Sequence, residues 1–534
     1  MPGYKKSVKG TALQQLRNLF RLSVHSEDQD IHDVEALIAE QKRQVLSRRK
    51  FLSDTAKTAA LIGMAGMYQS CATANKSEQP TIAIIGAGIA GLHAAYILKQ
   101  AGYTAYVYEG SPRIGGRIMS VNGMMGEGLW TEMGGEFIDS THTDMLNLTK
   151  HFNLPLLDRL EPSELALEEF AYYFNGQHYH LKDVLEALHP YTAQIKKDID
   201  SLSEEISYKK HSPVDVRLDN MSIMEYIDSL GIKGWFRDFI YNSYTCEYGM
   251  EATEQSAISL LAVFDPGDDT EYKLYGDSDE RYSVIGGNLK VCEALNNELQ
   301  DYVLTNHFLT SIKQQEDKSY QLNFKMSGAG SIGVNADIIL MTMPFTVLRE
   351  VDLQVPLPEW KMNTIKNLGY GSNSKMFIGV NERVWRKQGY AGYAFSDNGT
   401  MNGYEHTQMQ NNNMGPGGYT IFPGGKAGIE VGNMDLNEAK TKYVKALDGV
   451  FPGVAAQFNN NFQLWNWPGY VFSKASYVSY KVGQYTGMAG SEFEPVGNMY
   501  FAGEHCSYAF QGFMNGGAQT GRQAAELIIA KLKV

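Results

Sequence analysis

A glycine-rich turn between an apolar segment and a helical segment constrains the fold of this chain more than any other feature. Segment 81–85 has the continuous hydrophobicity of a buried parallel strand. Gly86, Gly88 and Gly91 follow it directly, and segment 92–101 has helical periodicity. In such a unit the first glycine makes the tight turn, the second lets backbone approach a pyrophosphate, and the third lets helix pack on strand. The pattern predicts a Rossmann-like α/β unit that binds a nucleotide at the helix N-terminus.

An acidic residue at the end of the next strand supports this interpretation. A second strand is expected at Ala105–Tyr108, and Glu109 follows it, 18 residues after Gly91. A carboxylate at that place binds ribose hydroxyls and disfavours a 2′-phosphate. Because the glycine motif alone is weak evidence, a merely structural βαβ unit is the alternative. Strand, glycines, helix, strand and acid in this order favour the nucleotide site.

Two further glycine-rich turns narrow the choice of nucleotide. Segment 111–117 reads Ser-Pro-Arg-Ile-Gly-Gly-Arg, and segment 133–138 reads Met-Gly-Gly-Glu-Phe-Ile. The first resembles the Gly-Gly-Arg extension of FAD-dependent amine oxidases, and the second continues that resemblance. It implies that Arg117 neutralises the pyrophosphate, that Gly116 lets backbone pass the ribityl chain, and that the glycines of the second turn lie against the flavin. FAD is therefore the expected cofactor.

The C-terminal end resembles the terminal motif of the same enzymes. A short strand is expected at 498–502, followed by Gly503 and Glu504, the segment 512–517 (Gly-Phe-Met-Asn-Gly-Gly) and a final helix. The resemblance implies that Glu504 accepts a hydrogen bond from the ribityl chain. It also implies that the helix, starting near Gly516, places positive potential beside the pyrimidine end of the flavin. An amphipathic helix after a glycine turn is the alternative.

The chain therefore resembles the flavin-containing amine oxidase superfamily, of the monoamine oxidase and L-amino acid oxidase type, over nearly all of residues 81–534. The resemblance implies an α/β fold in which a Rossmann-like FAD-binding domain is interleaved with an α+β substrate domain of mixed sheet and helices. We expect the FAD-binding domain at 81–138, 281–345 and 490–534, and the substrate domain at 139–280 and 346–489. The residues expected to contact FAD are Gly86, Gly88, Ile89, Ala90, Gly91, Glu109, Gly116, Arg117, Gly134, Gly135, Leu309, Gly503, Glu504, Phe513 and Met514.

The family also suggests which residues carry the chemistry. It places a lysine near flavin N5 through a water, and Lys375 matches that lysine; a surface lysine on a strand is the alternative. Tyr477 and Phe513 match two aromatic positions that flank the substrate, unless either ring only packs in the core. Members with covalently bound flavin have a cysteine where this chain has Ser476. A serine cannot form that thioether, so we expect non-covalent FAD.

The expected reaction is oxidation of the C–N bond of an L-amino acid or a primary amine. Hydride passes to flavin N5, the imine hydrolyses to a keto acid or aldehyde plus ammonia, and O2 becomes H2O2. L-Amino acid oxidases have an arginine after the second glycine turn that clamps the carboxylate. This chain has Glu136 there, which could attract a second amine or satisfy backbone donors. Arg217, Arg237 or Arg281 could supply the clamp instead.

Several functions remain open at this point. Segment 503–505 (Gly-Glu-His) resembles amino-acid oxidases more than animal monoamine oxidases, which favours amino acids. A monoamine or polyamine oxidase without amino-acid activity is the first alternative. An FAD-dependent desaturase or a non-catalytic flavin-binding protein shares the same two motifs, although a desaturase has no reason to keep Lys375 and the aromatic pair.

Composition excludes some partners. The chain has 47 basic and 60 acidic residues, a net charge of −13. A surface of that sign repels phosphate backbones, so nucleic acid is not an expected partner. No uninterrupted apolar run reaches the ~18–20 residues of a membrane-crossing helix. The four cysteines form no Cys-x-x-Cys pair, so we expect no metal site. Association as a homodimer stays open.

Residues 1–80 are expected to be an export signal region and a linker. Arg48 and Arg49 precede the short, mildly apolar stretch 58–67, which resembles a twin-arginine export signal and predicts a periplasmic or extracellular location. An amphipathic helix with a basic cluster is the alternative. Cys71 could carry a lipid anchor or be a plain linker cysteine. The folded body is expected to begin at Thr81.

Overall fold

The computed structural model describes residues 11–25, 79–264, 278–328 and 330–533. The arginine pair 48–49, the apolar stretch 58–67 and Cys71 lie outside the described residues. Among the helices in the described ranges, none combines the length and hydrophobicity needed to cross a membrane.

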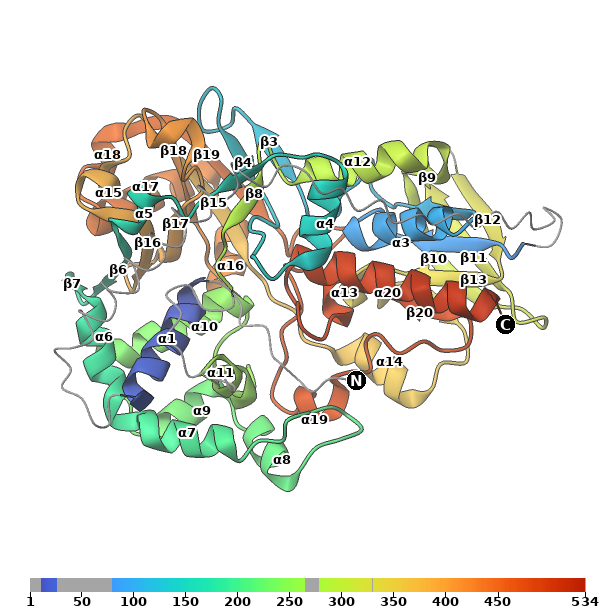
Figure 1. Ribbon diagram of the computed structural model, residues 1–534, viewed down its shortest axis with the longest axis horizontal. Helices are drawn as coiled ribbons and strands as arrows, with labels where there is room; N and C mark the ends of the chain where they lie inside the picture. Colours follow the sequence, from blue (N-terminus) through green and yellow to red (C-terminus); the bar gives the residue numbers. More distant parts are fainter. Residues whose placement is uncertain (1–10, 26–78, 265–277, 329, 534) are drawn as a thin grey trace, which may run out of the picture.

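A five-stranded parallel sheet forms the nucleotide-binding part. Its order is β20-β13-β1-β2-β9. The strands are β1 (Ile82–Ile85), β2 (Ala105–Tyr108), β9 (Val303–Leu304), β13 (Ile338–Met341) and β20 (Met499–Phe501). Helices α3 (Ile89–Gln100) and α20 (Met514–Leu532) pack side by side on it (Figure 1), and α12 (Leu289–Leu299) packs on α3. All four residues of β1 and of β13 are buried, which is why these strands read as continuous apolar runs.

A seven-stranded mixed sheet forms the other main layer. Its order is β19-β15-β18-β17-β16-β6-β7. The strands are β6 (Glu168–Phe174), β7 (Gln177–Tyr179), β15 (Ser374–Val380), β16 (Tyr390–Ser396), β17 (Met401–Glu405), β18 (Gly417–Ile421) and β19 (Phe458–Asn466). Helix α16 (Gly425–Gly432) packs against β15 and β19, and helix α17 (Leu436–Val450) packs against β19. Every residue of β15, β17 and β18 is buried, so this part of the sheet is covered on both faces.

A layer of short helices completes the substrate side (Figure 1). The helices are α6 (Leu181–Leu188), α7 (Thr192–Asp200), α8 (Pro213–Asp219), α9 (Ile223–Ser229), α10 (Gly234–Tyr248) and α11 (Ala257–Phe264). Ser212 and Ser222 each begin a helix with a capping box, which defines the starts of α8 and α9. All eight residues of α11 are buried, so α11 is the centre of this layer.

The structure differs from the expectation that the folded body begins at Thr81. Helix α1 (Thr11–His25) packs against α6, α7, α10 and α11. Leu16, Leu19 and Phe20 are buried in the same hydrophobic cluster as these helices. The amphipathic pattern of 11–25 explains the packing of its apolar side chains against a hydrophobic layer, but not the burial of Arg17 and Arg21 on its polar face. Residues 11–25 are therefore part of the folded body.

A four-stranded sheet of order β12-β11-β10-β14 completes the core beside the nucleotide-binding part. Its strands are β10 (His307–Gln314), β11 (Tyr320–Met326), β12 (Gly330–Ala336) and β14 (Asp352–Gln354). Two elements in the segments expected for the substrate domain pack with the other part: β14 pairs with β10, and α4 (Thr143–His151) packs on α20. The overall α/β class with interleaved segments is confirmed, and the domain boundaries stay a prediction.

Candidate active site

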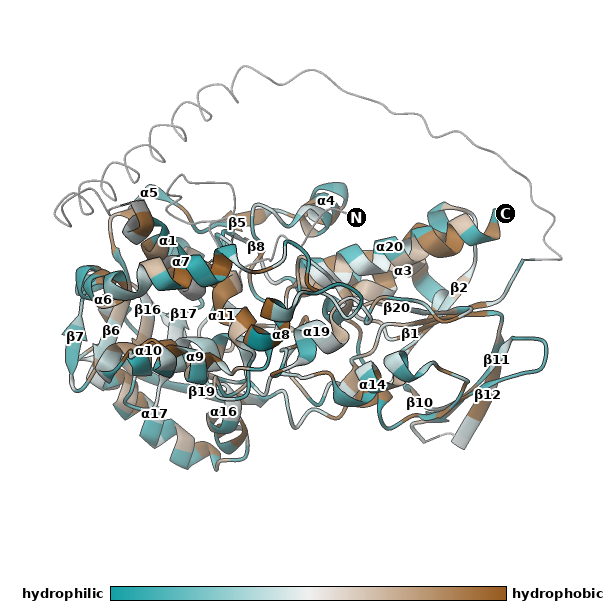
Figure 2. Ribbon diagram, turned by 90° about the horizontal axis from the view of Figure 1, so that it is seen from below, coloured by the Kyte–Doolittle hydropathy of each residue, from teal (hydrophilic) through white to brown (hydrophobic). Residues whose placement is uncertain are grey.

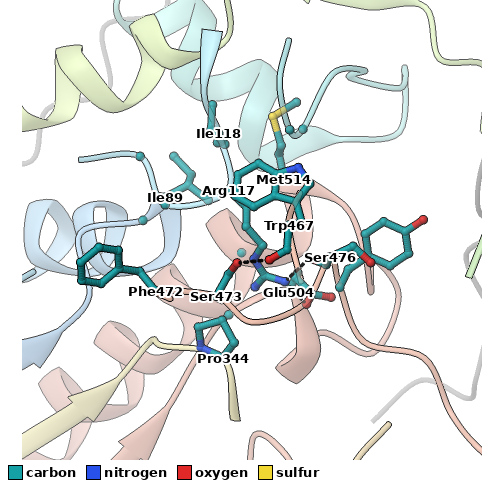
Figure 3. Close-up of a pocket in the computed structure, with 18 of the residues that line it drawn as sticks. Ile89, Arg117, Ile118, Pro344, Trp467, Phe472, Ser473, Ser476, Glu504 and Met514 are labelled. Carbon is teal, nitrogen blue, oxygen red and sulfur yellow. Dashed lines mark hydrogen bonds and ion pairs between the residues drawn. The ribbon is translucent and has the colours of Figure 1, made fainter. Parts of the chain in front are cut away.

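A cavity lies where β1 and β2 end, between the parallel sheet and the seven-stranded sheet. Side chains from both ends of the sequence face it: Figure 3 shows Ile89 and Arg117 from the N-terminal motifs near Glu504 and Met514 from the C-terminal motif. The predicted residues that line it are Gly86, Gly88, Ile89, Ala90, Glu109, Gly116, Arg117, Gly134, Gly135, Glu136, Leu309, Lys375, Tyr477, Gly503, Glu504, Phe513 and Met514.

Gly91 is the predicted residue that does not line the cavity. A Cβ atom on Gly91 would lie 2.0 Å from the carbonyl oxygen of Gly86. The third glycine therefore allows helix α3 to approach the turn that precedes it, as the motif predicts. Its contribution to the site is indirect, through the position of the helix N-terminus.

The first glycine turn fits a pyrophosphate. Gly86 has φ of +114°, a conformation that residues with a side chain rarely adopt. Gly88 begins helix α3; no side chain of the described residues caps that end, and no acidic residue lies in the first turn. The free backbone N–H groups and the helix dipole therefore face the cavity, as an anion requires. A Cβ on Gly88 would meet nothing closer than Cα of Gly116, at 4.0 Å, so the space above Gly88 is open.

Glu109 holds the two glycine turns together. Its Oε2 accepts a hydrogen bond from the backbone nitrogen of Ala87 at 2.8 Å, and its Oε1 accepts one from that of Ser111 at 2.8 Å. The backbone nitrogen of Gly115 also donates to the carbonyl of Ala87, at 2.8 Å. Glu109 lines the cavity, so its predicted contact with ribose stays a prediction beside this bracing role.

An ion pair joins the N-terminal and C-terminal motifs. Nη1 of Arg117 lies 2.8 Å from Oε1 of Glu504 and donates to the carbonyl of Ser476 at 2.7 Å. Oε1 of Glu504 also accepts from the nitrogen of Val478, and Oε2 accepts from that of Gly512. Both residues therefore fasten the loops around the cavity. The predicted bond from Glu504 to a ribityl chain stays a prediction.

Lys375 is buried at the centre of the site. Its side chain on β15 is 5% exposed, which excludes the surface lysine considered from the sequence. Nζ donates to the carbonyl oxygens of Glu132 at 3.1 Å and Gly134 at 3.0 Å, and lies 2.9 Å from Oε2 of Glu136. An ammonium has three donors, so these partners fix the position of Nζ beside the second glycine turn.

Glu136 combines a paired and an unpaired oxygen. Oε2 accepts from the hydroxyl of Tyr404 at 2.7 Å as well as from Lys375. Oε1 is buried, and no hydrogen-bond donor reaches it from the described part of the chain. Within the described part of the chain, Glu136 therefore does not satisfy backbone donors, one of the two roles considered from the sequence. A buried acceptor without a donor is costly, which suits an atom that binds a ligand.

The two aromatic residues are held by different neighbours. The hydroxyl of Tyr477 donates to the carbonyl of Glu247 at 2.6 Å, and burial raises its pKa well above the usual range. The ring of Phe513 packs edge-on against His142, with centroids 4.8 Å apart. Across the described residues no ring contact joins Tyr477 to Phe513, and both line the cavity. This arrangement suits two walls of a slot.

The sequence did not point to His142, whose ring packs against that of Phe513. His142 accepts a hydrogen bond at Nδ1 from the backbone nitrogen of Asp139, at 2.9 Å. Burial lowers the pKa of His142 to about 3, so the ring is neutral at physiological pH. Its sequence signal is weak, since only its place shortly after the second glycine turn points to the site.

The three arginines considered as a carboxylate clamp lie elsewhere. Arg237 and Arg281 pair with Asp228 and Asp158 at 2.7 and 2.8 Å, and Arg217 lies 4.0 Å from Asp198; none lines the cavity. Sequence reasoning did not consider Arg159, whose guanidinium lies over the ring of Phe137 at 4.4 Å and donates to Gln408. Arg117 is the arginine that lines the cavity in the described structure.

The glycine turns, the joined terminal motifs and the buried lysine define a flavoprotein oxidoreductase that acts on amines. The family model "Flavin containing amine oxidoreductase" matches residues 89–529, and the chain belongs to that family. Its cofactor is FAD, and its members act on amines with O2.

Individual proteins are also similar to this chain, although their sequence identity to it is low. A flavin-containing amine oxidase of Danio rerio is 22% identical over 463 residues, covering 84% of this chain and 86% of the relative. An L-amino-acid oxidase of Bothrops moojeni is 22% identical over 332 residues, covering 59% of this chain and 62% of the relative. The structure of cyclohexylamine oxidase from Brevibacterium oxydans superposes with a TM-score of 0.72 at 21% identity, over 86% of this chain and all of that one.

The attachment of FAD gives a first testable prediction. The hydroxyl of Ser476 donates to Oδ1 of Asn373 at 2.7 Å, and an oxygen at this position cannot form a thioether. Acid precipitation of the purified protein is therefore expected to leave the yellow colour in the supernatant. A yellow pellet that keeps its colour after washing would show a covalent bond.

Proposed function

We propose that this chain oxidises cationic amines that carry no carboxylate beside the reacting nitrogen, giving an aldehyde or ketone, ammonia and H2O2. The proposal rests on the charged groups at the end of the cavity beside Lys375, which we call the substrate end. Glu136 and Glu280 line this end, and the ammonium of Lys375 is already paired with Glu136. Arg117 is engaged by Glu504. A substrate carboxylate would be repelled here, whereas an ammonium group would be attracted.

Glu280 is held in place at the cavity wall. Its carboxylate accepts from the hydroxyl of Tyr393 at 2.8 Å, and its backbone nitrogen donates to Oδ1 of Asp139 at 3.0 Å. Its φ of +40° is uncommon for a residue with a side chain, so these contacts stabilise an unfavourable conformation. A fixed carboxylate on the cavity wall favours substrates with a second positive charge, such as diamines.

The residues around the reacting nitrogen have distinct roles in this proposal. FAD bound in this cavity would supply the hydride acceptor for the substrate carbon and the route by which the electrons reach O2. Tyr477 and Phe513 flank the substrate and keep bulk water away from it. Oε1 of Glu136, buried and without a donor from the chain, accepts an N–H of the substrate amine. Lys375 holds a positive charge beside the second glycine turn, where it stabilises negative charge that develops during oxidation.

The comparisons support the choice of amine over amino acid. The relative named amine oxidase matches most of this chain, and the superposed structure is of an oxidase of cyclohexylamine, which has no carboxylate. The match to an L-amino-acid oxidase covers a shorter part of both chains. The cavity charges and these matches together favour amines, although the terminal motif alone favours amino acids.

Glu280→Gln tests the role of the second charge. Putrescine and n-pentylamine have similar length and differ in the second ammonium, so only the KM for putrescine is expected to rise, by roughly tenfold. Steady-state peroxide release from both amines by the wild type and the variant measures this. Tyr393→Phe is the matched control, since it removes the hydrogen bond to Glu280 but keeps the carboxylate. Equal KM changes for both amines, or peroxide from L-amino acids alone, would contradict the proposal.

A further inference from the structure

Helix α1 is buried in the fold, although it comes before the expected export signal in the sequence. Leu16, Arg17, Asn18, Leu19, Phe20 and Arg21 are six consecutive residues, and all are buried. Successive residues of an α-helix point about 100° apart, so six in a row face every direction. Helix α1 is therefore enclosed on all sides at this point, unlike a leader that lies on a surface. Figures 1 and 2 both place it among α7, α10 and α11.

The contacts of α1 are those of a core helix. The ring of Phe20 packs against that of Phe264 on α11, with centroids 5.1 Å apart. Ser23, also buried, has its hydroxyl 2.8 Å from Nδ1 of His189 and 2.7 Å from the hydroxyl of Thr192. Both apolar packing and polar pairing therefore join α1 to two different sides of the helical layer. Such paired contacts are typical of residues that belong to the native core.

Because α1 comes before the twin-arginine segment, its burial bears on what cleavage after an export signal would do to the protein. The twin-arginine segment 47–52 follows α1 in the sequence, and strand β1 begins only at Ile82. Cleavage after an export signal would remove everything before the cut. Here it would also separate a buried helix from the helical layer of the substrate side.

We propose that residues 11–25 remain in the mature, active enzyme as a structural part of the substrate side. The twin-arginine segment is then an internal segment between α1 and β1. A cut between that segment and β1 yields two chains that stay associated through the contacts of α1. If the twin-arginine pathway exports this protein, it exports a folded body that already contains α1.

The direct experiment cuts the chain between α1 and β1. A specific protease site is introduced into the polar linker 72–80 of the full-length holoenzyme, which is then cleaved and run on a native sizing column. We expect both fragments to elute together with FAD absorbance retained, and to separate only in denaturant. An N-terminal fragment that elutes alone, with the thermal midpoint of the remainder unchanged, would overturn the proposal.

Point variants test the same contacts without a cut. Phe20→Ala is expected to lower the thermal midpoint by several degrees, because it removes a buried ring. Leu436→Ala is the matched control, since Leu436 is 45% exposed on α17 and its loss is expected to leave the midpoint unchanged. A Phe20→Ala protein as stable as the control would show that α1 is dispensable. Tryptic peptides 10–17 and 18–21 in enzyme purified from an exporting host would show directly that α1 is retained.

Discussion

Replacement of Lys375 by methionine is expected to lower turnover by about 100-fold or more while FAD stays bound. The ammonium is buried between two carbonyl oxygens and Glu136, and no other described lysine lines the cavity. Methionine has a similar length but no charge, so the site loses its positive group without an added volume. Steady-state peroxide release and the flavin-to-protein absorbance ratio measure the two effects separately.

A second variant separates catalysis from stability. Lys375→Met leaves the buried carboxylate of Glu136 without its cation, and breaking a buried pair in this way costs about 3–5 kcal/mol. Adding Glu136→Gln removes that carboxylate charge and keeps an amide oxygen that can accept the N–H of the substrate amine. The double variant is therefore expected to regain thermal stability and to stay slow. Recovery of turnover in the double variant, or full turnover in Lys375→Met alone, would show that Lys375 has only a structural role.

Gly88→Val is expected to abolish FAD binding and leave the fold intact. Gly88 has φ of −75° and ψ of 176°, which any residue adopts, and a Cβ there would meet no atom closer than 4.0 Å. An added Cβ therefore fits the apoprotein, and the larger side chain of valine is expected to take up the open space beside the N-terminus of α3. The purified variant should be colourless and inactive, with far-ultraviolet circular dichroism like that of wild-type apoprotein.

Gly91→Ala is the matched control for the same motif. Its Cβ would lie 2.0 Å from the carbonyl oxygen of Gly86, so it is expected to destabilise the protein whether or not FAD is present. Gly88→Val thus tests the space expected to hold the cofactor, whereas Gly91→Ala tests the packing of helix α3. If the Gly88→Val variant kept a normal FAD content, the pyrophosphate would have to bind away from helix α3, and the position expected for it here would be wrong.

The structure brings the cofactor-side motifs of the sequence together at one cavity, and the signals of these motifs are local. The turns around Gly86, Gly116 and Gly503 each depend on a few adjacent residues whose backbone requirements are visible in the residue types. Burial on both faces also leaves β1 as an unbroken apolar run. Motifs at the two ends of the chain could therefore be assigned to one site from the residue pattern alone.

The substrate side was less predictable because its contacts join distant residues. Lys375 and Glu136 are 239 positions apart, and their pairing changes Glu136 from a free anion into the counter-ion of the lysine. The arginines suggested for a carboxylate clamp each lie near an aspartate away from the cavity. The amphipathic pattern of 11–25 was present in the sequence, but its partner, the helical layer, begins more than 150 residues later.

Anaerobic mixing of the purified full chain with single substrates tests the central claim most directly. Putrescine or cyclohexylamine should bleach the oxidised-flavin absorbance, and readmitted O2 should restore it with release of H2O2. L-Leucine and L-phenylalanine should leave the absorbance unchanged, because the substrate end of the cavity carries carboxylates and no available arginine in the described structure. Bleaching by the amino acids but by neither amine would contradict this account and make Arg159 the candidate carboxylate ligand.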